Sequence, residues 1–269
     1  SIFALGIALL IGFLIILPFV WMVSTSFCDM GDAYRLPPRL IPEEIHLRNY
    51  MEIFESNVPF MSLFLNSCKI TFIVLLIQLP SCALAGYAFA RLQFPFKNAL
   101  FFLVLGSMMV PAQVTVIPAY VIMNRLRLVD THASIVCLSV TSAFGIFLLR
   151  QFFKTVPKEI EESAKIDGAS NFRIFSSVML PQSGASIATL GILTFNGVWN
   201  DYFKPLMFLN TWEKMTLPLG ISALKGFMAS GNPAVVMAAV SLSVLPVFLF
   251  FLFGQRYFID GMTLGAVKG

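Results

Sequence analysis

Long apolar stretches alternate with short polar connections along the whole chain. Six of these stretches approach the ~20 residues that a helix needs to cross a ~30 Å hydrocarbon core. The pattern predicts spans at Ile2–Ser24, Asn66–Phe89, Ala99–Val121, Ser134–Phe153, Gln182–Leu209 and Val235–Tyr257. Helices are expected because a lipid-exposed backbone must satisfy its own hydrogen bonds, and no alternation with a period of two residues indicates a barrel.

Proline and glycine are expected to shape several of these spans. Each proline inside a span removes one hydrogen bond and should kink its helix; these are Pro80, Pro111, Pro118 and Pro246. Small residues allow helices to approach closely, and the fifth span contains Gly184, Gly191 and Gly197.

The composition confines the chain to the membrane class. Of its 269 residues, 58% are hydrophobic and only 12% are charged, with a mean hydropathy of +0.83. Soluble domains carry about a quarter charged residues. The net charge of +4 fits the basic bias of cytoplasmic loops in membrane proteins, and no basic run indicates nucleic-acid binding.

Metal and disulfide chemistry are not expected. The cysteines, which are Cys28, Cys68, Cys82 and Cys137, form no C-x-x-C pair, and His46 and His132 lie far apart. The apolar run from Ile2 to Val23 exceeds the 7–15 residues of a secretory signal core, so it is expected to remain as a membrane helix.

Basic residues indicate the orientation. They are dense near the span ends in the connections after spans two and four, at Arg91, Lys97, Arg150, Lys154, Lys158, Lys165 and Arg173. Because basic loops stay inside, we expect these connections and both termini to be cytoplasmic in a multi-pass protein.

The chain lacks the motifs of an energy source of its own. It contains no G-x-x-x-x-G-K-[ST], H-E-x-x-H or G-x-S-x-G pattern, and the span centres hold no Asp, Glu or His. A stand-alone secondary transporter or channel would need membrane carboxylates and an internal repeat, and a membrane enzyme would need clustered catalytic groups. None is visible, so we expect a non-enzyme whose energy comes from elsewhere.

The connection between spans four and five is predicted to form two short helices. Pro157 suits the first turn of one helix, with Thr155 or Val156 as its cap, and Glu161 is spaced to pair with Lys165. Gly168 is a natural left-handed stop. Ser170 can cap a second helix, whose apolar face would comprise Phe172, Phe175, Val178 and Met179.

The first of these helices has a face suited to docking. Ile160, Ser163, Ala164 and Asp167 share that face, and their modest size would let it enter a groove on another protein. A helix resting on lipid headgroups is the alternative, although three acids in its first turn would then face anionic lipid.

The same segment resembles a known family. Glu162-Ser163-Ala164, Asp167-Gly168-Ala169 and Leu180-Pro181 are similar to the E-A-A…G…L-P loop of binding-protein-dependent ABC importer permeases, in particular the sugar importers. The resemblance covers nearly the whole chain. It extends to Arg150–Phe153, Trp199-Asn200-Asp201 and the tail Gly265–Gly269, and Ser163 departs from the usual alanine.

The resemblance implies an all-α type I importer permease fold with six transmembrane helices and a coupling-helix loop. Its domains would be 1–61 (first helix and outer loop), 62–256 (transmembrane domain, with the coupling loop at about 155–181) and 257–269 (cytoplasmic tail). ATPase coupling would fall to Glu162, Ser163, Ala164, Asp167, Gly168, Leu180 and Pro181, and the tail contact to Gly265, Ala266, Val267, Lys268 and Gly269.

The implied partners are a second, non-identical permease, an ATP-binding cassette ATPase dimer that carries the ATP and Mg, and an extracytoplasmic solute-binding protein. The outer connection around Lys204–Asn232 would lie near that binding protein. The chain would bind no cofactor and would reside in the bacterial cytoplasmic membrane.

The cargo is less defined. Amides, a carboxylate and aromatic rings typical of sugar recognition occur at Asn196, Trp199, Asn200, Asp201 and Tyr202. A packed, partly polar helix turn is the alternative. A sugar or oligosaccharide is expected, with glycerol phosphate, amino acids or polyamines as other cargoes of the same class.

Overall fold

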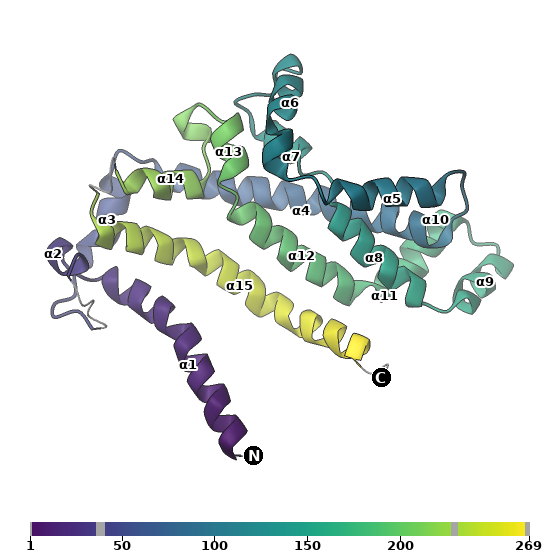
Figure 1. Cartoon of the computed structure of the whole chain (residues 1–269), viewed down its shortest axis with the longest axis horizontal. Helices are drawn as coiled ribbons and strands as arrows, with labels where there is room; N and C mark the ends of the chain where they lie inside the picture. The colour runs from purple at the N-terminus through teal and green to yellow at the C-terminus, as the bar shows by residue number, and fades with distance from the viewer. Residues whose placement is uncertain (1, 36–40, 227–230, 267–269) are drawn as a thin grey trace. The chain divides into compact units, whose positions relative to one another are not determined.

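The computed structural model describes residues 2–35, 41–226 and 231–266, with side chains described between Phe3 and Gly254 of those ranges. All regular structure in this part of the chain is helical (Figure 1). Helices long and apolar enough to cross a membrane are Phe3–Thr25, Phe60–Arg91 and Pro233–Gly254. Two bent helix pairs raise their number to five if each pair is one span. The expected all-α membrane protein is confirmed.

The first compact unit comprises Ser1–Asn66 and Met215–Pro246. Its helices are α1 (Ile2–Thr25), α2 (Met30–Ala33), α3 (Arg48–Glu55), the start of α4 (Phe60–Arg91), α14 (Leu217–Leu224) and the start of α15 (Pro233–Ala266). The apolar side chains of α1 are exposed, as lipid contact requires. The buried Asn49 amide donates to the carbonyls of Ser26 and Cys28, at 2.9 and 2.8 Å, and so ties α3 to the chain after α1.

The second unit comprises Ser67–Lys214 and Val247–Gly269. It contains the remainder of α4 and α15 together with α5 (Lys97–Ser107), α6 (Ala112–Arg125), α7 (His132–Cys137), α8 (Ala143–Thr155), α9 (Lys158–Ile166), α10 (Asn171–Ile174), a π-helical turn (Phe175–Met179), α11 (Leu180–Gln182), α12 (Gly184–Trp199), α13 (Phe203–Phe208) and the short 3-10 turn Trp212–Lys214.

The core of the second unit lies between α4, α8 and the segment after α9. Tyr87, Phe153 and Phe175 make ring contacts there, with Tyr87 5.8 Å from Phe153 and 5.3 Å from Phe175 between centroids. Aromatic pairs in this geometry each add about 0.5–1.5 kcal/mol beyond the burial of their area. This aromatic core therefore packs against the α9–α11 segment.

Three expected spans are broken where the sequence predicted single helices. The third bends by 104° between α5 and α6, at a break immediately before Pro111. The fourth divides into α7 and α8 around residues 138–142, and the fifth is α12 alone, with α13 separate from it. The helices α4 and α15 instead run through Pro80 and Pro246 without a break, and α15 continues past Tyr257 to Ala266.

One close helix approach occurs at a glycine that the sequence did not single out. A methyl group on Gly86 of α4 would lie 3.0 Å from the Arg150 nitrogen and from the Leu149 Cβ of α8. By contrast, Gly184 and Gly197 have open space around them. The expectation of close packing at the fifth-span glycines was therefore wrong for these two residues, whereas Gly191 lies in ordinary contact with Leu79.

Candidate functional site

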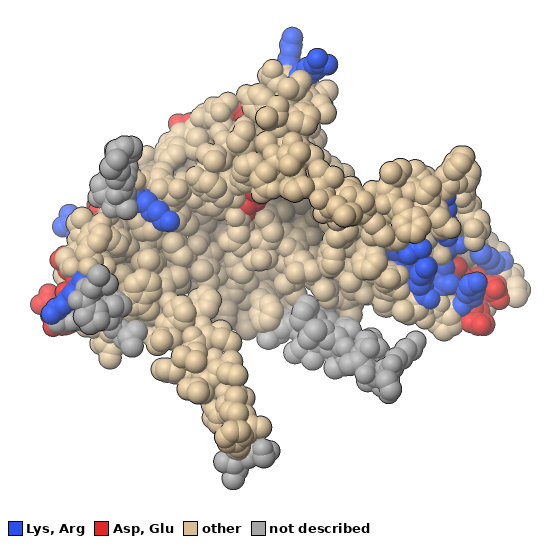
Figure 2. All heavy atoms as spheres, in the orientation of Figure 1, with Lys and Arg blue, Asp and Glu red and all other residues tan. Residues whose placement is uncertain are grey.

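The first candidate site is the corner formed by α9, Gly168 and α10. Charged side chains gather at the end of the second unit where α9 lies (Figure 2). Gly168 has a φ of +79°, which confirms the predicted left-handed stop. Its N–H donates to the Lys165 carbonyl, and the Ala169 N–H donates to the Ala164 carbonyl, both at 3.0 Å. This pair of bonds is a Schellman motif, so the turn direction is fixed by the backbone.

The predicted docking face is divided: Ser163 and Asp167 lie on the outside of this corner, whereas Ile160 and Ala164 pack against the core of the unit, so the face as predicted is wrong for these two residues. Glu162, Ser163, Asp167 and Gly168 are exposed, and Ala164 is half-buried. The helix starts one residue later than predicted, because Pro157 occupies the cap position and α9 begins at Lys158. The exposed residues are available to another protein.

The second helix of the corner is only partly as predicted. The Ser170 hydroxyl accepts a hydrogen bond from the Arg173 N–H at 3.3 Å, so the cap is confirmed. Phe175 and Met179 are buried, but Phe172 is 69% exposed and Val178 is half-buried, and Ile174 joins the buried face instead. Leu180 and Pro181 follow in α11, half-buried and exposed respectively.

A buried ion pair anchors α9 to α4. The Arg91 Nε lies 3.0 Å from a carboxylate oxygen of Glu161, and the two side chains are 7% and 8% exposed. Arg91 also donates to the Val156 carbonyl at the end of α8. The predicted Glu161–Lys165 pair is therefore wrong, since the Glu161 side chain faces inward. One guanidinium joins the ends of α4, α8 and α9.

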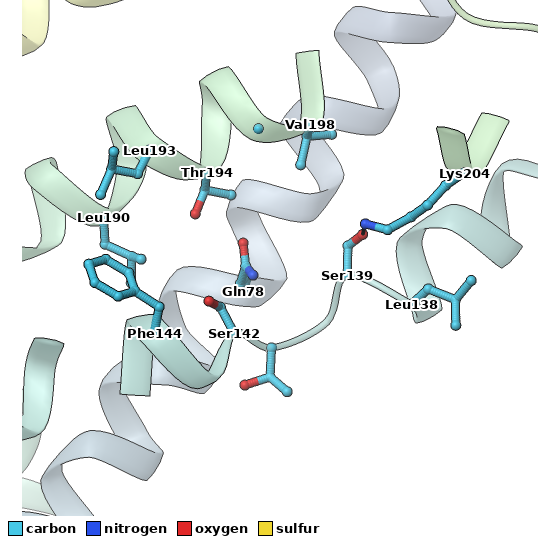
Figure 3. Close-up of a pocket in the computed structure, with 12 residues that line it drawn as sticks. Gln78, Leu138, Ser139, Ser142, Phe144, Leu190, Leu193, Thr194, Val198 and Lys204 are labelled. Atoms are coloured by element: carbon cyan, nitrogen blue, oxygen red, sulfur yellow. Dashed lines mark hydrogen bonds between the residues drawn. The ribbon is translucent and has the colours of Figure 1, made fainter. Parts of the chain in front are cut away.

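The second candidate site is a hollow of about 360 Å³ between α4, α8 and α12 (Figure 3). Its polar lining comes from Gln78, Ser139, Thr141, Ser142, Thr194 and Lys204. The non-helical residues 138–142 form part of its wall, where the Ser81 hydroxyl donates to the Val140 carbonyl at 2.7 Å. Non-helical backbone at membrane depth is tolerated only where protein covers it or where it lines a cavity. The break in the fourth span is thus explained by the hollow.

The hollow carries no uncompensated charge. Lys204 supplies the cation of the lining, and its amine lies 3.4 Å from an Asp201 carboxylate oxygen and 3.0 Å from the Ser139 hydroxyl. A ligand in this space meets hydroxyls and an amide rather than a net charge.

The residues predicted to contact cargo lie near the hollow but do not line it. Trp199 is 3% exposed and stacks on Phe195, with centroids 5.6 Å apart. Asn196 and Asn200 are exposed and bonded to each other at 2.9 Å, Asp201 reaches the hollow only through Lys204, and Tyr202 is 41% exposed.

The carboxylate of Asp130, in the loop after α6, holds two loops together by hydrogen bonds. Asp130 accepts hydrogen bonds from the Asn210 and Thr211 N–H groups, the Thr211 hydroxyl and the Lys214 amine. These donors, with the Thr211 hydroxyl foremost, hold the pKa of Asp130 well below its usual range. The connection after Lys204 is therefore anchored to the loop before α7.

The predicted tail contact is described only in part. Gly265 and Ala266 end α15, whereas Val267, Lys268 and Gly269 lie outside the described residues.

The helical membrane fold, the exposed glycine corner and the lined hollow define a multi-pass permease-like protein. A model of the family described as "Binding-protein-dependent transport system inner membrane component" matches residues 83–263, and the chain belongs to this family. The resemblance stated from the segment between the fourth and fifth spans is confirmed.

Named relatives agree with the family. The chain is 31% identical over 261 residues to the arabinooligosaccharides transport system permease protein AraQ of Halalkalibacterium halodurans, covering 96% of this chain and 93% of that protein. It is 32% identical over 265 residues to the sn-glycerol-3-phosphate transport system permease protein UgpE of Escherichia coli O1:K1, covering 95% and 93%.

A solved structure supports the fold. A chain from a bacterial ABC transporter involved in the import of the acidic polysaccharide alginate superimposes with a TM-score of 0.82 at 23% identity, over 96% of both chains.

Sequence reasoning missed the residues that connect distant segments. Arg91 belongs to α4, and its partners Val156 and Glu161 lie more than sixty positions away, so no local spacing reveals them. Gln78 of α4 lines the hollow together with residues from Leu138 onward, which local spacing does not reveal either. The cluster Ser139, Thr141 and Ser142 inside an apolar span was a usable signal, since polar residues at membrane depth mark cavities.

Proposed function

We propose that the chain is the non-catalytic permease subunit of an ATP-driven importer for neutral sugars or oligosaccharides. The observation that carries the proposal is the exposed corner at Gly168, which presents Glu162, Ser163 and Asp167 in a chain of this family. A separate ATPase dimer, which carries ATP and Mg, would bind this corner. Its movement would be transmitted by the corner to α4 and α8.

The hollow is proposed as the part of the cargo pathway that this subunit contributes. A second permease would complete it, and a solute-binding protein would deliver the cargo. The family name and the arabinooligosaccharide relative support this assignment. The glycerol phosphate relative favours the second candidate cargo.

The charge of the hollow distinguishes the two cargoes. A phosphate ester carries nearly two negative charges, and its recognition requires cations that are not already paired. Lys204 is neutralised by Asp201, whereas the hydroxyls and the amide of the lining suit a polyhydroxylated solute. A neutral sugar is therefore the better match.

Uptake of radiolabelled arabinotriose and sn-glycerol 3-phosphate by the assembled importer in proteoliposomes tests the proposal. Thr194→Leu should reduce sugar uptake at least tenfold, while the matched change Asn196→Leu outside the lining should leave it within twofold. Phosphate ester uptake without sugar uptake would overturn the cargo assignment, and uptake by the chain alone would overturn the function.

The topology follows from the same proposal. The corner and both termini would be cytoplasmic in the inner membrane, with Asp130 outside. Because native Cys137 is exposed, the test uses a background in which the four native cysteines are replaced by serine. In that background Ser163→Cys should react with an impermeant maleimide only after the cells are opened, and Asn210→Cys should react in intact cells. The reverse pattern would refute this orientation.

A further inference from the structure

A basic hollow of about 510 Å³ lies beside the start of α5 and plays no part in the function proposed above. Its lining includes the cations Lys97, Arg150 and Lys154 and the amides of Gln93 and Asn98, and no Asp or Glu lies among its lining residues. We propose that this basic hollow binds the phosphate of an anionic phospholipid headgroup.

The charges of the basic hollow are uncompensated. The Lys97 amine donates to the Leu92 carbonyl at 2.6 Å, and the Arg150 Nε donates to the Phe89 carbonyl at 3.2 Å, so both meet only neutral acceptors. Lys154 is exposed and makes no hydrogen bond or ion pair with any described residue. By contrast, nearby Arg91 is neutralised by Glu161. Three cations without a carboxylate partner around one space favour the binding of an anion there.

The fixed positions of two of these cations make this a built site. The Arg150 guanidinium lies 3.8 Å from the centroid of the Phe101 ring, which holds its plane, and Lys97 is fixed by the carbonyl at the end of α4. Their remaining N–H groups can donate to phosphate oxygens in charge-assisted bonds.

The surroundings favour a lipid as the source of the phosphate. Phe96 caps α5 with a φ of +58° and is 80% exposed, an uncommon backbone conformation that projects its ring outward. Phe102 and Leu103 of α5 are 70% and 71% exposed, which makes this face of α5 suited to acyl chains. Cations at a helix end above an apolar helix face are the arrangement that binds anionic headgroups.

Native mass spectrometry of the purified full chain in neutral detergent, with phosphatidylglycerol or phosphatidylcholine added, tests the proposal. Each cation near a headgroup contributes roughly fivefold to affinity. Lys97→Gln with Lys154→Gln should therefore weaken phosphatidylglycerol binding about 30-fold and leave phosphatidylcholine unchanged.

The matched control is Arg125→Gln with Arg127→Gln, which removes two exposed cations at and just after the end of α6. It should leave phosphatidylglycerol binding unchanged. Lys154→Gln alone should weaken phosphatidylglycerol binding about fivefold. Because the Lys154 side chain has no partner among the described residues, this change should leave the fold intact. Equal phosphatidylglycerol binding by the wild type and the double variant would overturn the proposal.

A parallel titration with inorganic phosphate separates the two sources. Phosphate binding that depends on Lys97 and Lys154 without any preference for phosphatidylglycerol would refute the lipid assignment. A phosphatidylglycerol preference that 50-fold excess phosphate does not displace would support it.

Discussion

Removing the Glu161 charge should release α9 from the rest of the second unit. In Glu161→Gln, the guanidinium of Arg91 stays buried at 7% exposure without a counter-ion. Breaking a buried ion pair in this way costs about 3–5 kcal/mol, because the desolvated charge that remains is not compensated. Since the pair joins α9 to α4, we expect the loss to appear as local opening of α9.

Hydrogen–deuterium exchange of the α9 amides measures this opening. A loss of about 3–5 kcal/mol corresponds to exchange roughly 10²- to 4 × 10³-fold faster, at 1.4 kcal/mol for each factor of ten. Amides in the α4 core should exchange as in the wild type. In the complete importer, ATP hydrolysis should continue while transport per ATP falls.

Two variants control for the charge itself. Glu162→Gln makes the same chemical change one residue later at an exposed position and should leave exchange unchanged. Arg91→Met combined with Glu161→Met removes both charges, and replacing a whole buried pair with apolar side chains is often neutral. It should restore slow exchange apart from about 1 kcal/mol for the Val156 carbonyl. Unchanged exchange in Glu161→Gln would refute the anchoring role.

Three further outcomes follow from the structure. Gly168→Val should cost about 1–2 kcal/mol at the corner and reduce co-purification of the ATPase. Gly168→Asn should retain the ATPase, because asparagine tolerates the left-handed region. Equal retention by both variants would contradict the role of the backbone turn. The lowered pKa of Asp130 means that its stabilisation is complete above the ordinary value of 3.8 and is lost as the pH falls through the folded value. Asp130→Asn should lower stability by about 2 kcal/mol at pH 7 and reduce the further fall below pH 4 in thermal unfolding; an unchanged fall below pH 4 would contradict the role of Asp130. Gly86→Ala should lower the stability of the purified chain by about 1–3 kcal/mol in thermal unfolding, because the new methyl meets the Arg150 backbone; a wild-type midpoint would show that α8 can move aside.

The sequence predicts continuous features better than interrupted ones. Hydropathy alone located α1, α4 and α15, since a long apolar run has no other stable form in lipid. It did not reveal the break at 138–142, because a few serines and threonines barely change the mean hydropathy of a span. The left-handed Gly168 and the Ser170 cap were predicted correctly because both depend on neighbouring residues only.

Contacts across the fold could not be predicted in this way. Local spacing offered Lys165 as the partner of Glu161, whereas the Arg91 guanidinium at the end of α4 is the actual partner. The predicted cargo residue Trp199 turned out to belong to the packed interior. Which side of a polar helix turn faces a hollow depends on the neighbouring helices, and no single-sequence pattern encodes their placement.

The break between α5 and α6 lets the chain turn inside an apolar stretch. At Met108–Val110 the regular helical ladder stops, and Met109 is 85% exposed. The N–H groups of Met108, Met109 and Val110 nevertheless donate to the carbonyls of Leu105, Gly106 and Ser107. Because the donors of the elbow find acceptors within the preceding turn, the chain changes direction there without placing a bare amide N–H in an apolar environment.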